Sequence, residues 1–230
     1  MLVSVIIPTL NEEAFILEAI HAARQDSCPD ELEIIIVDGG SHDETLRLIP
    51  SDMRVISSTP GRATQMNLGA AQARGDILVF CHADSRLPQG WRAAVIEALR
   101  KPGVSGGTFQ LLILPESGIL KFRNRINFPA NWRMMYGDQV QFMARTTFEQ
   151  IGGFPELPIM EDLEMSRALA KIGHLVRIPL RVRTSSRRFA ENRPRSQWLL
   201  SVQCVILYLY FGVSAEEIKK IYTRGAQRAP

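Results

Sequence analysis

The chain has 230 residues, 46% of them hydrophobic and 22% charged. This composition excludes a disordered or fibrous protein and is typical of a globular protein with a core of ordinary size. The formal net charge of +3 is unevenly divided, because residues 1–173 carry 16 Lys and Arg against 21 Asp and Glu, whereas residues 174–230 carry 11 against 3. The basic C-terminal part suits either an anionic surface or the acidic body of the same chain, and both interpretations stay open.

Cysteine spacing and hydropathy exclude further classes. Cys28, Cys81 and Cys204 are odd in number, far apart and form no CxxC pair, which disfavours a disulfide framework or a zinc site and fits a reducing cytosol. A strand begins at the N-terminus, so we expect no secretory signal and a cytoplasmic protein. The nearly uncharged run 198–213 is shorter than the roughly 20 residues that span a bilayer. We expect a helix packed on protein, with attachment to the inner face of the membrane as the alternative.

Apolar runs alternate with helical patterns in the first half of the chain. Runs rich in Val and Ile are typical of parallel strands buried on both faces; they begin at Val3 and continue at 33–38, 54–57 and 76–81. Helices are expected after Asn11, after Ser41 in a capping-box pattern with Glu44, from 63 to 73 with Gly75 as the C-cap, and from 88 to 101. This order predicts an α/β fold with a mostly parallel, doubly wound, Rossmann-like sheet and helices on both faces.

From Gly103 the pattern changes. Strands are expected at 104–114, with a bend or bulge at its Gly-Gly pair, at 139–144 and near 175–178, and a helix at 160–172. A polar, arginine-rich segment at 181–195 and two closing helices follow. We interpret one domain with three parts: a nucleotide-binding half at 1–102, an acceptor and catalytic half at 103–180, and a basic tail with C-terminal helices at 181–230.

Three of the apolar runs end in acidic turns. Glu12, Asp38 and Asp84 follow the first, second and last of the four runs. Because the carboxyl ends of parallel strands meet at one edge of a sheet, we expect these carboxylates to gather there. Their mutual repulsion favours a cation or hydrogen-bond donors between them.

The motifs at this edge are not those of the common nucleotide sites. No GxGxxG follows the first strand and no P-loop is present. Instead the chain resembles the family 2 glycosyltransferases with a GT-A fold over about residues 3–173, and its details look closest to a bacterial subgroup linked to arsenosugar biosynthesis. The matching pieces are Ser4-Val-Ile-Ile-Pro-Thr-Leu-Asn-Glu12, residues 36–45, Gly61-Arg62 with Asn67-Leu-Gly69, His82-Ala-Asp84 and Glu161-Asp162.

The resemblance implies an inverting, metal-dependent transfer from a nucleotide-diphosphate sugar, a UDP-sugar first of all, to an unidentified hydroxyl acceptor. The acceptor is a small molecule, a lipid-linked molecule or a glycan, and no nucleic acid is expected. A divalent cation, Mn²⁺ or Mg²⁺, would neutralise the leaving diphosphate, with Asp84 as its protein carboxylate. The family usually has Asp-x-Asp at this turn, whereas here His82 takes the first position. His82 is a metal ligand, a contact to ribose or phosphate, or a strand-end histidine with no ligand role.

The resemblance also assigns the other site residues. Asp38 stands where the family's base-reading aspartate stands, and its alternative is a turn carboxylate. The nucleotide is expected to contact Pro8, Thr9, Asn11, Glu12, Asp38, Arg62, Asn67 and Ala83. For Asn67 a surface position is an equal alternative. Glu161 and Asp162 match the family's Glu-Asp pair, in which the aspartate is the general base, although first-turn acids are common at helix starts.

Weaker features point to the acceptor and to partners. Tyr136-Gly-Asp-Gln139 either lines the acceptor side or forms a structural turn, and Arg187 and Arg188 would reach a donor diphosphate, an acidic acceptor or anionic lipid. The C-terminal helices are also candidates for a homodimer contact. A nucleotidyltransferase is the rival enzyme, but a glycine-rich basic loop after the first strand is missing. A non-catalytic nucleotide-sugar-binding or membrane-surface protein is supported only by His82 in place of an acid.

Overall fold

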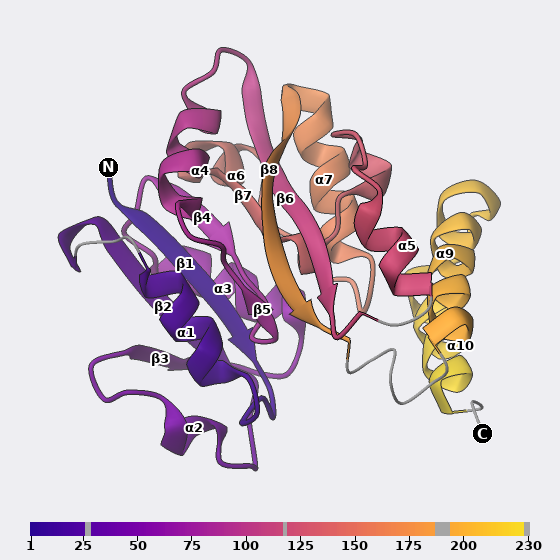
Figure 1. The fold of residues 1–230 in the computed structure, drawn as a ribbon, viewed down its shortest axis with the longest axis horizontal. Helices are drawn as coiled ribbons and strands as arrows, with labels where there is room; N and C mark the ends of the chain where they lie inside the picture. The colour runs from indigo at the N-terminus through magenta and orange to yellow at the C-terminus, as the bar shows by residue number, and fades with distance from the viewer. Residues whose placement is uncertain (26–28, 117–118, 187–193, 228–230) are drawn as a thin grey trace.

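Eight strands form one sheet in the order β3-β2-β1-β4-β7-β6-β8-β5 (Figure 1). The computed structural model describes residues 1–25, 29–116, 119–186 and 194–227, so Cys28, Arg187 and Arg188 lie outside the described residues. The strands are β1 Val3–Thr9, β2 Leu32–Asp38, β3 Arg54–Ser57, β4 Ile77–Phe80, β5 Ser85–Arg86, β6 Val104–Leu114, β7 Gln141–Ala144 and β8 His174–Ser185. The predicted α/β class is confirmed, because β1 to β4 pair in parallel and β6 pairs in parallel with β8.

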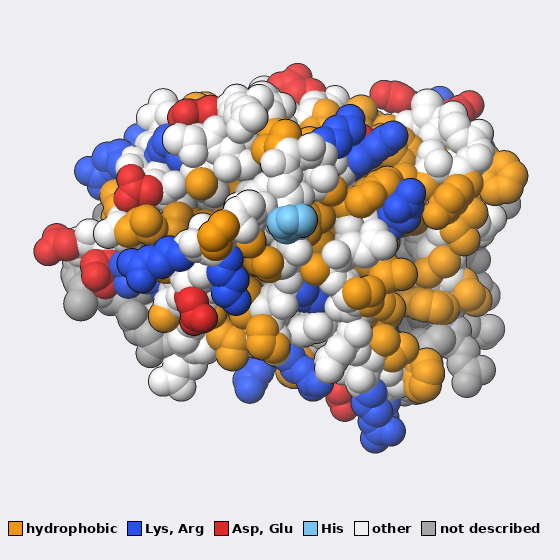
Figure 2. All heavy atoms as spheres, turned by 90° about the horizontal axis from the view of Figure 1, so that it is seen from above, with side chains coloured by type: hydrophobic (Ala, Val, Ile, Leu, Met, Phe, Trp, Pro, Cys, Tyr) orange, Lys and Arg blue, Asp and Glu red, His pale blue; other side chains and the backbone are white. Residues whose placement is uncertain are grey.

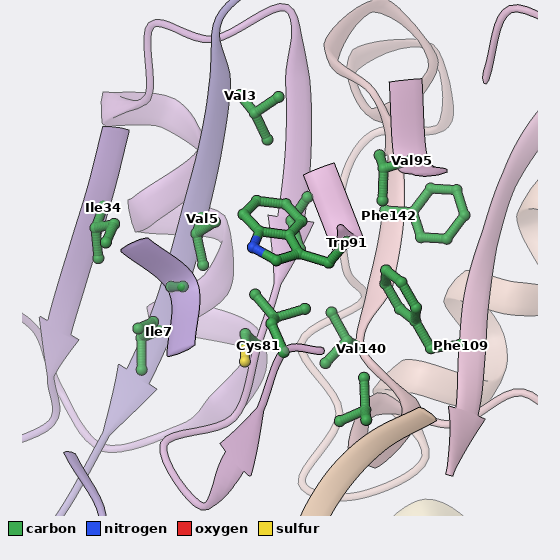
Figure 3. Close-up of a cluster of buried hydrophobic side chains, with 14 of the residues drawn as sticks. Val3, Val5, Ile7, Ile34, Cys81, Trp91, Val95, Phe109, Val140 and Phe142 are labelled. Carbon is green, nitrogen blue, oxygen red and sulfur yellow. The ribbon is translucent and has the colours of Figure 1, made fainter. Parts of the chain in front are cut away.

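Helices cover both faces of the sheet. They are α1 Ile16–Arg24, α2 Thr45–Leu48, α3 Arg62–Gln72, α4 Trp91–Leu99, α5 Ile119–Arg125, α6 Arg145–Ile151, α7 Glu161–Ile172, α9 Pro194–Phe211 and α10 Ala215–Gln227, with short 3-10 turns η1 Pro29–Glu31, η2 Trp132–Met134 and η3 Gly137–Gln139. On one face, α1 and α4 pack around the buried Trp91 (Figure 3). On the other, α3, α6 and α7 pack around Met66, Phe148 and Leu169. Continuous burial of β1 explains why its sequence is mostly apolar, with Ser4 and Thr9 as the buried polar residues.

The second half of the sheet differs from the expectation. β7 runs antiparallel to both β4 and β6, and the short β5 runs antiparallel to β8. The expected strand end at Ile178 is wrong, because β8 continues to Ser185. Phe109 pairs with Ile178 and Gln110 with Arg181, so Pro179 and Leu180 are extra residues in a bulge. Proline has no N–H for the ladder, and the bulge accommodates it.

Glycines permit close approaches where β6 enters the sheet. The predicted irregularity is confirmed, since the register of β6 shifts between Val104 and Gly106. A Cβ at Gly107 would lie 2.3 Å from the carbonyl oxygen of Val176, so a larger residue there would push the two strands apart. Gly75 works in the same way and not as the expected helix cap: α3 ends at Gln72, and a Cβ at Gly75 would lie 2.6 Å from the backbone nitrogen of Ser4.

The two predicted closing helices are present and form a third core away from the sheet. Met160 and Leu163 of the α7 region pack with Cys204 of α9 and Ile218 of α10. In Figure 1 this helical pair lies beside α5 and α7, at the end of the molecule opposite β3. Within the described residues, no helix combines the length and apolar character needed to cross a membrane.

Candidate active site

The first part of the site lies where β1 and β2 end side by side. Thr9 and Asp38 are register partners at the ends of these strands. Asp38 is 4% exposed, and its Oδ2 accepts from the backbone N–H groups of Gly40 and Ser41 at 2.9 and 3.0 Å. Its Oδ1 accepts from the Ser41 hydroxyl at 2.5 Å. The carboxylate is therefore fixed in orientation at the strand edge, with lone pairs left on Oδ1.

Ser41 ties this turn to the loop after β1 and does not cap a helix. The Ser41 hydroxyl accepts from the backbone N–H of Asn11, and the Asn11 amide oxygen accepts from the backbone N–H of His42, both at 2.9 Å. The capping-box prediction is wrong, because α2 begins only at Thr45 and has no side-chain cap. The same hydroxyl instead binds Asp38, whose fixed carboxylate competes successfully for it.

Gln65 of α3 is a site-forming residue that the sequence reasoning missed. It is 3% exposed, and its amide nitrogen donates to the carbonyls of Thr9 and Val37 at 2.9 and 2.7 Å. Thr9 is the last residue of β1 and Val37 the last but one of β2, so one helix side chain holds both strand ends together. An isolated glutamine at helical spacing gave no signal for this role.

The other residues expected at the nucleotide differ in how far their side chains are buried. Thr9 and Ala83 are only 1% and 2% exposed and Pro8 is buried, so their side chains shape the site from below. Glu12 is half-buried, and its backbone N–H donates to the Thr45 hydroxyl. Among the described residues, no three acidic, His or Cys side chains gather as a metal-binding group. Glu12, Asp38 and Asp84 therefore do not form a three-carboxylate metal site between them.

Asn67 is used by the protein backbone. Its amide nitrogen donates to the Phe154 carbonyl at 2.8 Å, and its amide oxygen accepts from the Phe154 N–H at 2.9 Å. This two-point contact fastens the turn at Gly152-Gly153 to α3. The hydrogen bonds of Asn67 therefore give no support to the expected nucleotide contact, and they assign it a structural role.

His82 and Asp84 follow β4 and form the second part of the site. They are 7% and 6% exposed. Within the part of the chain that is described, the Asp84 carboxylate receives one hydrogen bond, from the Ser85 hydroxyl to Oδ1 at 3.4 Å. Its Oδ2 is thus left for a ligand, and an oxygen donor of this kind fits Mg²⁺ or Mn²⁺ that takes its remaining ligands from substrate phosphates and water. The donor set fits a cation shared with the substrate and not one held by protein alone.

Gly137 of η3 joins His82 to Asp162 at the start of α7. A Cβ at Gly137 would lie 2.8 Å from His82 Nε2 and 3.3 Å from Asp162 Oδ2. The Gly137 N–H donates to that Asp162 oxygen at 2.7 Å, while the Leu163 N–H donates to Oδ1 at 2.7 Å. The strand-end histidine and the helix-start aspartate therefore meet across one glycine.

Glu161 has a different partner from its neighbour. Its carboxylate is 1% exposed and contacts Arg62 Nε at 2.8 Å. Burial by itself lowers the pKa of Arg62, but the negative charges of Glu161 and Asp162 outweigh this and raise the pKa above its ordinary value. Arg62 is thus a permanent cation held at the start of α7, beside the candidate base.

Backbone strain is concentrated at these positions. Among the described residues, the non-glycine residues with positive φ are Asn11, Val140 and Met160. Asn11 lies in the first loop, Val140 follows η3, and Met160 immediately precedes Glu161. A left-handed conformation is especially costly for β-branched Val, and such strain clusters at functional sites. The strain coincides with the segments that carry the candidate site.

A separate cavity of about 440 Å³ lies between η2, α7 and the C-terminal helices. Aromatic side chains of Trp132, Tyr208 and Tyr210 line it together with Glu164 and Arg167. Its lining includes none of the residues expected at the nucleotide or the metal. Arg167 pairs with Glu164 at 3.5 Å, and its guanidinium carbon lies 5.6 Å from the centre of the Trp132 ring.

Comparison with known sequences shows which proteins the chain is similar to. The sequence model of glycosyl transferase family 2 matches residues 4–154. The probable glycosyltransferase YdaM of Bacillus subtilis is 25% identical over 201 residues, which cover 76% of this chain and 48% of YdaM. The poly(ribitol-phosphate) beta-N-acetylglucosaminyltransferase TarS of Staphylococcus aureus is 33% identical over 92 residues, 35% of this chain and 16% of TarS. The chain thus spans about half or less of the length of these relatives.

Solved structures match almost the whole chain in fold. S. aureus TarS 1–349 in complex with UDP-GlcNAc has a TM-score of 0.66 at 17% identity, covering 98% of this chain and 71% of that one. The mannosyltransferase PcManGT of Pyrobaculum calidifontis, in complex with GDP-Man and Mn²⁺, has a TM-score of 0.64 at 19% identity, with 97% and 73% covered. At these identities the likeness shows a shared fold, in agreement with the predicted GT-A architecture.

Proposed function

Because the chain belongs to glycosyl transferase family 2, we propose that it transfers a sugar, with inversion, from a nucleotide-diphosphate sugar to a hydroxyl acceptor. The main support is the meeting of the β4 end with the start of α7, where Gly137 contacts both His82 and Asp162. This places a metal-ligand candidate and a base candidate next to one another. In an inverting transfer, leaving-group stabilisation and acceptor activation act on opposite faces of one anomeric carbon, so their residues must border the same site.

In this proposal the first two strand ends bind the nucleotide. Asp38 would accept from a ring N–H of the base with the lone pairs that Ser41 leaves on Oδ1. This suits uracil or guanine and not adenine or cytosine, and we take a UDP-sugar as the first candidate. Asn11 and Glu12 would line the same edge. Gln65 positions this edge from beneath, because it binds the carbonyls that end both strands.

The third strand end and α7 carry the chemistry. Asp84, with or without His82, would hold Mn²⁺ or Mg²⁺, which when bound neutralises charge on the leaving diphosphate. Arg62 is a second cation for that diphosphate, and Glu161 keeps it in position. Asp162 takes the proton of the acceptor hydroxyl. The acceptor oxygen forms the new bond to the anomeric carbon as the nucleoside diphosphate departs. The two backbone donors to Asp162 fix its carboxylate and leave further lone pairs for that proton.

The acceptor is proposed only as a hydroxyl compound. The printed names of relatives differ here: TarS is a poly(ribitol-phosphate) transferase, and a Mycobacterium tuberculosis relative is a glucosyl-3-phosphoglycerate synthase. A place in arsenosugar biosynthesis is a finer proposal that rests on the sequence resemblance alone.

UDP release from a panel of UDP-sugars with Mn²⁺ tests the proposal. We expect Asp162→Asn to lower the rate by roughly 10²-fold or more while metal-dependent UDP binding, measured by calorimetry, stays intact. Asp84→Ala should lose both. Glu164→Gln, two residues further along α7, is the matched control and should keep both the rate of UDP release and metal-dependent UDP binding.

Two results would contradict this assignment. Equal rates for the wild type, Asp162→Asn and Asp84→Ala would remove these residues from the chemistry. Release of pyrophosphate from a nucleoside triphosphate and a sugar phosphate would instead favour the nucleotidyltransferase.

A further inference from the structure

Helix α9 is apolar on all sides, yet the protein covers only part of it. Cys204 is 1% exposed and lies in the third core, against which Leu200 and Leu207 also pack. The opposite side exposes hydrophobic side chains by 37 to 65%, and we call them the α9 apolar face: Leu199, Val202, Ile206 and Tyr210. A helix that is hydrophobic all round is normally buried or in contact with lipid, so this face is a candidate for contact with another surface.

The spacing of the α9 apolar face makes it a continuous stripe. Leu199, Val202, Ile206 and Tyr210 follow one another at three or four residues, which places them on one side of a helix. Trp198 and Tyr210 stand near the two ends of the stripe, and aromatic residues of this kind favour the boundary between lipid and water. Contiguous exposed apolar patches of this sort mark protein or membrane contacts.

Basic residues occur on both α5 and α10, although α10 also exposes Glu216 and Glu217 in its first turn. Helix α5 contacts α9 and exposes Phe122 by 68% between the exposed Lys121 and Arg125. Helix α10 adds the exposed Lys219 and Lys220. Neither α5 nor α9 contains an acidic residue. Figure 2 shows hydrophobic side chains gathered at this end of the molecule, at the right of the view, with Lys and Arg beside them.

We propose that the α9 apolar face, with the basic rim from α5 and α10, docks on the surface of an anionic lipid bilayer. The apolar stripe would enter the headgroup boundary while the basic residues contact lipid phosphates and carboxylates. Charge disfavours a second copy as the occupant, because α5 and α9 offer no acidic residue that could pair with Lys121 and Arg125 of the copy. The helix lies in the interface and does not span it, in keeping with its length.

Co-sedimentation with vesicles tests this. The wild type should pellet with phosphatidylcholine vesicles that contain phosphatidylserine, bind much less to pure phosphatidylcholine, and be released by high salt. Ile206→Glu should weaken binding by roughly tenfold or more, because it removes an apolar side chain that would enter the headgroup boundary and inserts a charge there. Lys121→Glu should weaken it by roughly fivefold or more, since each basic residue near an anionic surface contributes about 1 kcal/mol.

Matched controls separate docking from general surface effects. Leu46→Glu removes an apolar side chain of similar exposure on α2, 46% against 43% for Ile206, and Lys101→Glu removes an exposed charge after α4. Both should bind like the wild type. The proposal is overturned if the wild type stays in the supernatant with both vesicle types, or if Ile206→Glu binds as well as Leu46→Glu. A dimer in analytical ultracentrifugation that Ile206→Glu dissociates, without vesicle binding, would assign the face to a second copy.

Discussion

At the scale of single residues, the site depends on a glycine because there is no room for a side chain at its position. Gly137 is outside the left-handed region, so its backbone would accept another residue without strain. The restriction comes from its neighbours: His82 lies on one side and Asp162 on the other, and the Gly137 N–H binds Asp162. One small residue thus sets the spacing between two candidate functional groups.

We therefore expect Gly137→Ala to lower the rate of sugar transfer by roughly 10- to 100-fold, because a displacement of about 1 Å at reacting groups has effects of this size. Gly90→Ala is the control: its added Cβ meets no atom within 4 Å, although its positive φ costs some stability. The two variants should be compared by initial rates at a temperature where both are folded. Unchanged activity in Gly137→Ala would show that the spacing tolerates the methyl group.

Among elements, the parallel strands are joined by a buried acid that was not expected to have a structural role. Glu33 of β2 accepts from the Ser4 hydroxyl of β1 at 2.7 Å and from the Arg74 backbone N–H at 2.8 Å, and its other oxygen contacts the Arg74 guanidinium at 3.0 Å. Burial by itself raises the pKa of Glu33, but these donors outweigh burial and lower it below 4.5. The ionised form therefore stabilises the fold.

The pH dependence of Glu33→Gln follows from this direction. A lowered pKa in the folded state means that the stabilisation is present above about pH 4.5 and is lost as the pH falls through the folded value. We expect Glu33→Gln to lower the free energy of unfolding by about 1–3 kcal/mol near neutral pH, and by less near pH 4. Urea denaturation at both pH values measures it, with the exposed Glu97→Gln as control. A constant difference at both pH values would contradict the ionic role.

The elements also show where sequence reasoning succeeds and fails. Strands β1, β2 and β4 were predictable because burial on both faces requires a largely apolar run rich in Val and Ile. The end of β8 was missed because Pro179 normally terminates a ladder, although the buried Val182 and Thr184 alternate with exposed arginines in the pattern of a half-buried strand. That alternation was readable, whereas the bulge before it depends on the partner strand.

The candidate site was predictable in its residue types and less so in its contacts. Asp84 and Asp162 stand out by their motif positions, but the pairing of Arg62 with Glu161 and of Asn67 with Phe154 joins residues 99 and 87 positions apart. Ser41 illustrates this limit within a short segment. Its hydroxyl could cap the following helix or donate to Asp38, and the fixed carboxylate of Asp38 decides between the two. Which hydrogen-bond partner a side chain takes depends on the tertiary structure, so it could not be predicted from the local sequence.

Over the whole molecule, the third core connects the C-terminal helices to the candidate base. Met160 and Leu163 flank Glu161 and Asp162 in sequence, and both are buried against Cys204 and Ile218. Tyr136, next to Gly137, packs on the same cluster. The C-terminal helices thus support both segments that hold the Asp162 carboxylate, at a distance from the two cores that flank the sheet.

Ile218→Ala tests whether this support matters for activity. Ile218 is 0% exposed, and its truncation should cost about 2–5 kcal/mol of local stability. Because Ile218 packs against the α7 start and not against the sheet, we expect amides of α10 and of the first turn of α7 to exchange hydrogen faster while those of β1 and β2 keep their protection. The rate of sugar transfer should fall with this loosening.

Ile20→Ala removes an equally buried side chain from α1 in the sheet core, so it should lower global stability and leave the rate unchanged below its unfolding transition. Equal effects of the two variants on the rate would mean that the C-terminal helices stabilise the fold without positioning Asp162.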